Sequence, residues 1–176
     1  MKCDLCEIAK KKIKAEIIYE DKDILAVVKD MAATPGQVCI FPKQHSTIME
    51  LVPNRLINHI FKIANKLGIA VFESLGVQGT NIVVQNGTAA GQKVPHFCVN
   101  IIPRKEGDNL NLQWQPKQLM EDEIETPFLA LKEEGDQLVL EETESKEEVL
   151  TDGKTEVTVE KEDEDNYLIK QLRRIP

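Results

Sequence analysis

Two cysteines near the start of the chain, Cys3 and Cys6, stand three positions apart and together could bind a metal ion. At a turn or a helix start, this spacing brings both thiolates to one tetrahedral ion such as zinc. A redox-active pair would need the same spacing at a helix N-terminus within a β-α-β unit, and no strand precedes these residues. Two ordinary thiols without a ligand are the remaining interpretation.

A tetrahedral zinc site needs two more ligands, and the sequence has no second Cys-x-x-Cys pair to supply them. His45 follows the end of a predicted strand and His96 begins another, so both are candidate ligands in a folded sheet. His59 lies among polar residues of a predicted helix, where an exposed side chain is expected. Cys39 and Cys98 are the other thiols, and each also fits a small apolar position in a strand.

A second group of reactive side chains lies on one predicted strand, from His96 to Ile102. Because side chains alternate across a strand, His96, Cys98 and Asn100 share one face. The apolar residues between them form the other face, which is turned to the core. Three polar or reactive side chains in a row indicate a functional face, and a polar face turned to water is the simpler alternative.

Before this strand, residues 86–92 form a loop rich in glycine and alanine, and Lys93 follows it. Backbone N–H groups in such a loop can hold an anion, and small residues let a phosphate approach closely. Lys93 adds a positive charge at the end of the loop. The sequence therefore predicts a phosphate site here, with an ordinary hairpin loop as the alternative.

The elements that must position these residues are mostly short strands. A polar turn separates two β-branched runs, residues 17–19 and 24–28, which is typical of a hairpin. Further strands are predicted at Val38–Phe41, Asn81–Val84 and His96–Ile102.

One long helix is the clearest element of the sequence. Apolar residues recur every three or four positions over Asn54–Leu75, and Gly76 supplies a typical helix end. A shorter helix is predicted at Leu5–Lys14 from its alanine and lysine content. With the strands, these helices predict an α+β fold, in which a mostly antiparallel sheet carries the long helix on one face.

Charge is distributed unevenly along the 176 residues. Residues 1–104 carry a net charge of +4 and residues 105–176 a net charge of −12, within a total of −8. We expect a domain over residues 1–110 and an acidic extension over residues 111–176. The low aromatic content, 5%, and the acidic total argue against a nucleic-acid partner.

The acidic extension has its own pattern. Residues 137–140 and 155–159 alternate like strands, and Asp152-Gly153 could turn them into a β-hairpin. An apolar and then basic segment at residues 166–174 is expected to dock on the body of the protein. The sequence has no apolar run typical of a signal peptide or a membrane span. We therefore expect a cytoplasmic protein with reduced cysteines and no membrane partner.

In their order and spacing, these segments resemble the histidine triad (HIT) superfamily. The resemblance covers about residues 1–110, and residues 166–176 resemble the end of some archaeal members. The segments that carry it are Cys3-x-x-Cys6, Tyr19-Glu20-Asp21, Thr34-Pro35-Gly36, Phe41-Pro42-Lys43-Gln44-His45, Asn81–Gly87, Ala90–His96 and Ile101–Arg104.

The resemblance implies a five-stranded antiparallel sheet with helices, a homodimer and a site for a purine nucleotide such as AMP or GMP. In the zinc-bearing branch of the superfamily, the metal is held by the N-terminal cysteine pair, a histidine after the Pro-Lys strand and the first histidine of the triad. Four protein ligands close the coordination sphere, so the implied zinc is structural. The corresponding positions here are Cys3, Cys6, His45 and His96.

The triad itself departs from the family pattern. The family's middle histidine attacks the α-phosphorus of a nucleotide and forms a covalent intermediate, and here that position is Cys98. The third position is Asn100, which can donate to a phosphate oxygen. The family's acidic residue for the ribose falls at about Lys29, with Asp30 one position later. Phosphate-binding roles fall on Gln85, Gly91, Gln92 and Lys93.

Three functions fit these observations. The first is a nucleotide-binding HIT protein with structural zinc and without the family's histidine-dependent hydrolase or transferase activity. The second is a nucleotide phosphoramidate or dinucleotide hydrolase with Cys98 as the nucleophile, in which no free base remains once His96 is assigned to zinc. The third is a scaffold whose acidic extension binds a basic protein partner.

Overall fold

The computed structural model describes residues 3–112 and 114–135. The described residues up to Leu110 form one compact unit, and those from Asn111 onward belong to a second. The hairpin and the terminal segment predicted for the acidic extension lie outside the described part of the chain.

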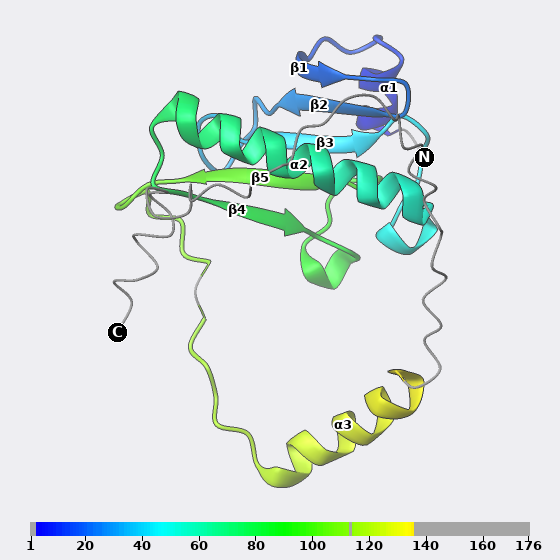
Figure 1. Ribbon diagram of the computed structural model, residues 1–176, viewed down its shortest axis with the longest axis vertical. Coiled ribbons are helices and arrows are strands. Elements are labelled where there is room, and N and C mark those ends of the chain that lie inside the picture. Colours follow the sequence, from blue (N-terminus) through cyan, green and yellow to red (C-terminus); the bar gives the residue numbers. More distant parts are fainter. Residues whose placement is uncertain (1–2, 113, 136–176) are drawn as a thin grey trace, which may run out of the picture. The chain divides into compact units, whose positions relative to one another are not determined.

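Five antiparallel strands form one sheet in the first unit (Figure 1). They are β1 (Glu16–Glu20), β2 (Ile24–Val28), β3 (Val38–Pro42), β4 (Gly79–Val84) and β5 (Val99–Arg104). Their order in the sheet is β1-β2-β3-β5-β4, so β1 and β4 are the edges. The expected α+β fold with a five-stranded antiparallel sheet is confirmed.

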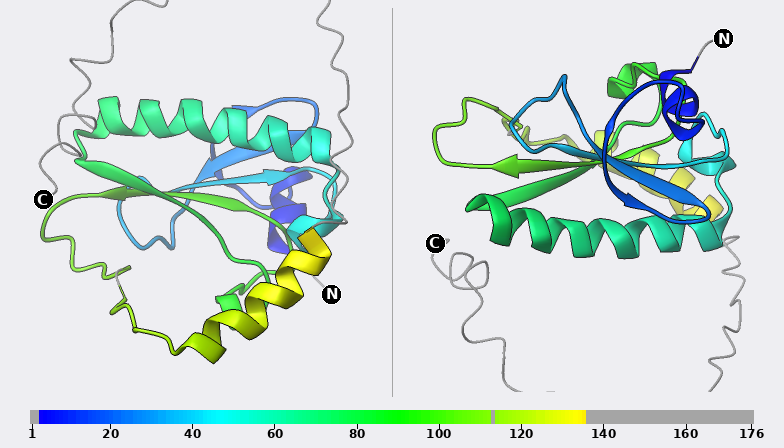
Figure 2. Two further views of the ribbon diagram at one scale, coloured as in Figure 1. Left: turned by 60° about the horizontal axis from the view of Figure 1, so that its bottom comes forward. Right: turned by 90° about the horizontal axis from the view of Figure 1, so that it is seen from above.

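The long helix α2 (Asn54–Leu75) covers one face of the sheet, as Figures 1 and 2 show. It has the bounds predicted from its apolar repeat, and Gly76 ends it in the left-handed conformation, at φ +55°. Its buried face shares a core cluster with apolar side chains of β2, β3 and β5. Burial of this face is the main stabilisation of the helix.

A short helix, α1 (Asp4–Ala9), lies on the opposite face of the sheet (Figure 2). The prediction of a helix as far as Lys14 is wrong, because α1 ends at Ala9 and Lys11 adopts φ +59°. Four lysines within residues 10–14 repel one another, which disfavours further helical turns. The apolar side chains of α1 pack on a second core cluster, made of Leu25, Val27, Cys39 and Phe41.

The last strand, β5, begins at Val99, later than the predicted start at His96. The N–H of His96 donates to the carbonyl of Val94 at 2.8 Å, and the N–H of Phe97 donates to the carbonyl of Ser46 at 2.6 Å. These two hydrogen bonds take the place of strand pairing. The segment just before β5 is therefore irregular, and it holds two of the predicted site residues.

In the second unit, α3 (Glu121–Gly135) is a helix that the sequence analysis did not predict. Ile124, Phe128 and Leu131 follow the helical period, and three acidic residues occupy the first turn, where they favour the helix dipole. Pro127 lies inside the helix, and a proline normally argues against one.

None of the described helices is long and apolar enough to cross a membrane.

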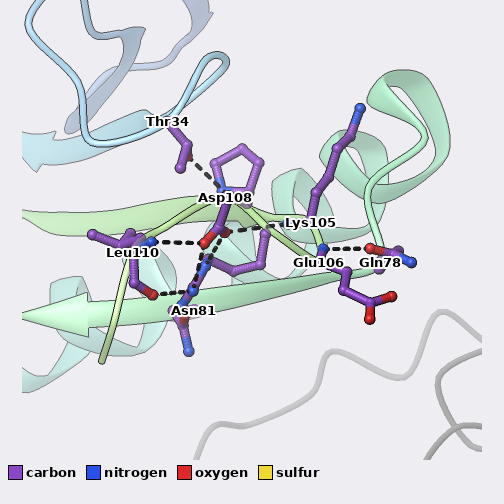
Figure 3. Close-up of polar contacts among 9 residues, drawn as sticks. Thr34, Gln78, Asn81, Lys105, Glu106, Asp108 and Leu110 are labelled. Atoms are coloured by element: carbon purple, nitrogen blue, oxygen red, sulfur yellow. Dashed lines mark hydrogen bonds and ion pairs between the residues drawn. The ribbon is translucent and has the colours of Figure 1, made fainter. Parts of the chain in front are cut away.

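The C-terminal end of β5 is fastened to the loop that follows it by an ion pair between Arg104 and Asp108. Arg104 donates to the two carboxylate oxygens of Asp108 at 2.6 and 3.0 Å, and to the side-chain oxygen of Asn81 on β4 at 2.6 Å. Asp108 also accepts the N–H of Leu110 at 2.9 Å, and Arg104 donates to the Leu110 carbonyl. Figure 3 shows Asp108, Leu110 and Asn81 gathered at this point. These contacts hold the end of the first unit against the edge strand.

At the other edge, the turn between β1 and β2 is tied to α2 through Asp21. The carboxylate accepts the backbone N–H groups of Asp23 and Ile24, both at 2.8 Å. It also accepts the hydroxyl of Tyr19 at 2.9 Å and lies 2.6 Å from Nε2 of His59 on α2. Burial raises the pKa of this carboxyl, but the hydrogen bonds outweigh burial and hold the pKa well below its usual range.

We predict that Asp21→Asn lowers the free energy of unfolding by about 2 kcal/mol at neutral pH, because hydrogen bonds to a charged group contribute roughly 1.5–3 kcal/mol. The folded-state pKa of Asp21 lies below that of an unfolded Asp, about 3.9. Its stabilisation is therefore complete above about pH 4 and is lost as the pH falls toward the folded-state pKa. Urea unfolding of wild type and variant, at neutral pH and in acid, measures the difference. A difference that does not shrink in acid would contradict a role for the charge.

Candidate metal centre and thiol site

The four residues predicted to hold zinc come together in the structure. Their ligand atoms, two sulfurs and two ring nitrogens, all lie within 4.8 Å of one another. Nδ1 of His96 is 3.3 Å from Sγ of Cys3 and 3.5 Å from Sγ of Cys6. Nδ1 of His45 is 3.2 Å from Sγ of Cys6.

These distances fit a tetrahedral zinc ion. With Zn–S bonds of about 2.3 Å and Zn–N bonds of about 2.0 Å, neighbouring sulfur and nitrogen ligands stand roughly 3.5 Å apart. Burial, and then the hydrogen bond with Cys3, raises the pKa of the Cys6 thiol. Two adjacent thiolates therefore need a cation, which a metal ion supplies. The four residues form a cluster that could hold a metal, and zinc suits their donor atoms.

The fold brings the ligands from three separate segments. Cys3 directly precedes α1 and Cys6 lies in its first turn, three positions on, so both lie on one side of the helix. His45 follows β3, and His96 lies in the irregular segment before β5. Because β3 and β5 are neighbours in the sheet, the two histidines meet, and their ring centroids are 5.1 Å apart.

A backbone contact prepares His96 for metal binding. Its Nε2 lies 2.9 Å from the carbonyl oxygen of Pro42, which can only accept, so Nε2 carries the proton. In the neutral ring, the lone pair of Nδ1 is then available to bind a metal ion held by the two cysteine sulfurs. Burial lowers the pKa of His96, which is 1% exposed, and favours the neutral ring that metals bind.

The predicted nucleophile position, Cys98, packs on the α1 side of the sheet. The amide of Asn100 donates to the Cys98 sulfur at 3.6 Å, so the two triad positions that depart from histidine are in contact. The thiol of Cys39 on β3 also interacts with this sulfur. The hydrogen bond with Cys39 lowers the pKa of Cys98 most, burial opposes it, and Asn100 and Lys29 add to the lowering, which brings the pKa to about 7.

A buried amide, Gln37, fixes the orientation of Asn100. Nε2 of Gln37 donates to Oδ1 of Asn100 at 3.0 Å, and its own Oε1 accepts the N–H of Ala33 at 2.8 Å. Because Oδ1 of Asn100 is the acceptor in this pair, its Nδ2 faces Cys98. Sequence patterns do not reveal Gln37 as a site residue, and they offer Cys39 only as a possible metal ligand or a core residue. The pairing of β3 with β5, which no local pattern encodes, brings Gln37 to Asn100 and Cys39 to Cys98.

The predicted phosphate loop is ordered by the side-chain amide of Gln92. Its Oε1 accepts the N–H of Gly87 at 2.8 Å, and its Nε2 donates to the carbonyls of Thr47 at 2.7 Å and Val94 at 3.0 Å. These three hydrogen bonds engage both polar atoms of the amide. Gln92 therefore holds the loop in shape by contacts with the backbone.

Asn86 connects the same loop to the segment before α2. Its Oδ1 accepts the N–H of Met49 at 3.0 Å, at the start of η1 (Met49–Leu51), a 3-10 helix of one turn. Its Nδ2 donates to both carboxylate oxygens of Glu50 at 2.7 Å. The loop itself contains a second 3-10 turn, η2 (Thr88–Ala90).

Two of the predicted phosphate-site residues, Gln85 and Gly91, lie against each other. Gly91 has φ +85°, a conformation that favours glycine, and a Cβ atom there would lie 2.6 Å from Nε2 of Gln85.

Lys93 is exposed just after the loop. Asp30 is exposed between β2 and β3, where its carboxylate accepts the N–H of Met31 at 2.7 Å. The contacts among the described residues do not link Asp30 or Lys93 to the Cys98 site.

Residues 10–107 match the family model of the HIT domain. The chain belongs to the HIT family. It is 36% identical over 106 residues to an uncharacterized HIT-like protein of Methanocaldococcus jannaschii, with 60% of this chain and 81% of the relative covered. It is 31% identical over 108 residues to an adenylylsulfatase of Arabidopsis thaliana, with 61% of this chain and 55% of the relative covered.

Among solved structures, a zinc-bound histidine triad family protein from Mycobacterium smegmatis resembles this HIT protein with a TM-score of 0.60. The two are 27% identical, and the match covers 78% of this chain and 99% of that one. The family match begins after Cys3 and Cys6, so it does not itself include the cysteine pair. The case for a metal in this HIT protein therefore depends on the geometry of the four ligands, and the zinc-bound neighbour agrees with it.

We predict that this HIT protein, purified without chelator, contains about one zinc ion per chain, as four protein ligands around one ion require. Cys6→Ser should lower the zinc content and the melting temperature, because it leaves three ligands. His59→Gln is the matched control for zinc content, since His59 is the one histidine outside the cluster. Elemental analysis of all three proteins measures the ratio. Wild type without metal, or equal loss in the His59 variant, would count against the cluster as a zinc site.

Proposed function

We propose that this HIT protein binds a purine nucleoside monophosphate such as AMP or GMP, without the histidine-dependent nucleotidyl chemistry of its family. One observation carries the proposal: Cys98, held by Asn100, stands where the family pattern has its nucleophilic histidine. In this proposal the loop of residues 86–92 and Lys93 bind the phosphate, and the imidazole that would attack it is missing. We further propose that the protein acts as a homodimer, as the family resemblance implies. A cytoplasmic location is part of the same proposal, in keeping with four cysteines that form no disulfide.

The zinc ion in this proposal is structural. Four protein ligands complete a tetrahedral coordination sphere and leave no position for a substrate or a water molecule. The ion would join α1 to the segments that follow β3 and precede β5. It would thereby hold the backbone on which Cys98 and Asn100 lie.

Several groups support a phosphate site near the loop of residues 86–92. Gln92 fixes the shape of the loop, and Gly91 adopts a conformation that brings the backbone close to Gln85. Lys93 supplies a positive charge. The relative from Arabidopsis thaliana is an adenylylsulfatase, which supports a nucleotide as the class of ligand.

A cysteine-dependent nucleotide hydrolase is the second candidate, because the Cys98 sulfur has neighbours that stabilise a thiolate. The amide of Asn100 donates to it, and the interaction with Cys39 lowers its pKa. In that reaction, the sulfur would bond to the α-phosphorus, the leaving group would depart, and water would then release the monophosphate. The third function, a basic partner for the acidic extension, stays a prediction, because most of that extension lies outside the described residues.

Release of AMP from adenosine 5′-phosphoramidate distinguishes the first two candidates. We expect wild type to bind AMP without turnover, and Cys98→His to release AMP, since it restores the missing imidazole. Cys98→Ala is the matched control and should stay inactive while it still binds AMP. Turnover by wild type that disappears in Cys98→Ala would replace the first candidate by the second.

A second prediction concerns Lys93. We expect Lys93→Ala to weaken AMP binding about tenfold, because a hydrogen bond to a charged group is worth roughly 1.5–3 kcal/mol. Lys66→Ala, on the exposed side of α2, is the control and should leave the affinity unchanged. Titration calorimetry with zinc-loaded protein measures both. Equal affinities for the two variants would remove Lys93 from the nucleotide site.

A further inference from the structure

A second pair of thiols, Cys39 and Cys98, lies outside the metal cluster. In the pairing of β3 with β5, Cys39 stands directly opposite Asn100. Cys98 lies two residues before Asn100, just outside β5. It packs against the core cluster that contains Cys39, so both thiols lie on the same face of the sheet. The two thiols also interact with each other.

Hydrogen bonds hold the Cys98 side of this pair in place. The amide of Asn100 donates to the Cys98 sulfur at 3.6 Å. Gln37 holds that amide in place from the far side. The Cys98 sulfur therefore keeps its position beside the cluster that contains Cys39.

The two thiols also differ in their access to solvent. Cys39 is 2% exposed and lies within the core cluster, whereas Cys98 is only half-buried. A small reagent from solution therefore meets Cys98 first. Cys39 is then the nearest group that can react with a modified Cys98.

We propose that Cys39 and Cys98 form a peroxide-sensitive dithiol that closes reversibly into a disulfide across β3 and the start of β5. The order of reaction follows from access: Cys98 is oxidised first, and Cys39 resolves the product. Because β5 begins at Val99, Cys98 lies outside the paired strand, and closing the disulfide does not require a strand hydrogen bond to break. The proposal concerns the thiols alone and does not depend on the proposed nucleotide function.

The reaction needs hydrogen peroxide as the oxidant and proceeds in two steps. The Cys98 sulfur attacks one peroxide oxygen, an S–O bond forms, the O–O bond breaks, and the departing oxygen leaves as water with the thiol proton. The Cys39 sulfur then attacks the sulfenic sulfur of Cys98, an S–S bond forms, and the S–O bond breaks. The released oxygen takes up the Cys39 proton and leaves as a second water. Two electrons pass from the sulfurs to the peroxide, and an added dithiol reverses the change.

Peptide mapping of the full-length, zinc-loaded protein after treatment with hydrogen peroxide tests the proposal. Trypsin separates Cys39 and Cys98 into peptides 30–43 and 94–104, while Cys3 and Cys6 share peptide 3–10. We expect peptides 30–43 and 94–104 to appear as one linked species, two hydrogens lighter than their sum, which dithiothreitol separates. Zinc content measured on the same sample shows whether the metal cluster stays intact.

Two variants make the outcome specific. In Cys39→Ala, no thiol resolves the sulfenic acid, so a sulfenic-acid probe should label Cys98 and excess peroxide should oxidise it irreversibly. Cys98→Ala should give no linked peptides and should keep its zinc. Wild type that shows the same irreversible oxidation as Cys39→Ala, or that forms a disulfide only within peptide 3–10, would overturn the proposal.

Discussion

The pairing of β3 with β5 is the contact on which both sites of this HIT protein depend. The two strands are distant in the sequence, and their antiparallel alignment sets Cys39 opposite Asn100. The same alignment brings the end of β3, with His45 beyond it, to the irregular segment that holds His96. A shift of one residue would turn every side chain of β5 to the other face, and it would dismantle the metal cluster and the thiol site together.

The buried polar groups around this strand pairing have hydrogen-bond partners. Gln37, Asn100 and His96 are each less than 10% exposed, and each has its hydrogen-bonding atoms engaged by neighbours. Among the described residues, no buried side-chain nitrogen or oxygen lacks a partner. An unmatched buried amide costs about 1–3 kcal/mol, so these contacts favour one arrangement of the strands over its alternatives. The orientation of the Cys98 neighbours is therefore part of what stabilises the fold.

Local patterns in the sequence were sufficient for the elements whose signals are periodic. The bounds of α2 follow from its apolar repeat and from Gly76, and the β1–β2 hairpin follows from its polar turn. The four metal ligands were reached through a family resemblance, since nothing in their spacing shows which strands adjoin. The roles of Gln37 and Cys39 depend on the alignment of β3 with β5, a long-range property that a single sequence does not display. α3 was missed because Pro127 masks its apolar period.

The three histidines of the chain decide what chemistry remains possible at Cys98. His45 and His96 direct their Nδ1 atoms to the cysteine pair, and Nε2 of His96 is engaged by the Pro42 carbonyl. His59 binds Asp21 from α2, on the opposite side of the sheet from Cys98. No imidazole is left to take a proton from the thiol or to give one to a leaving group. The neighbours that the structure gives Cys98 are a thiol, an amide and the charge of Lys29. Any reaction at this sulfur would therefore proceed without a histidine as general acid or base.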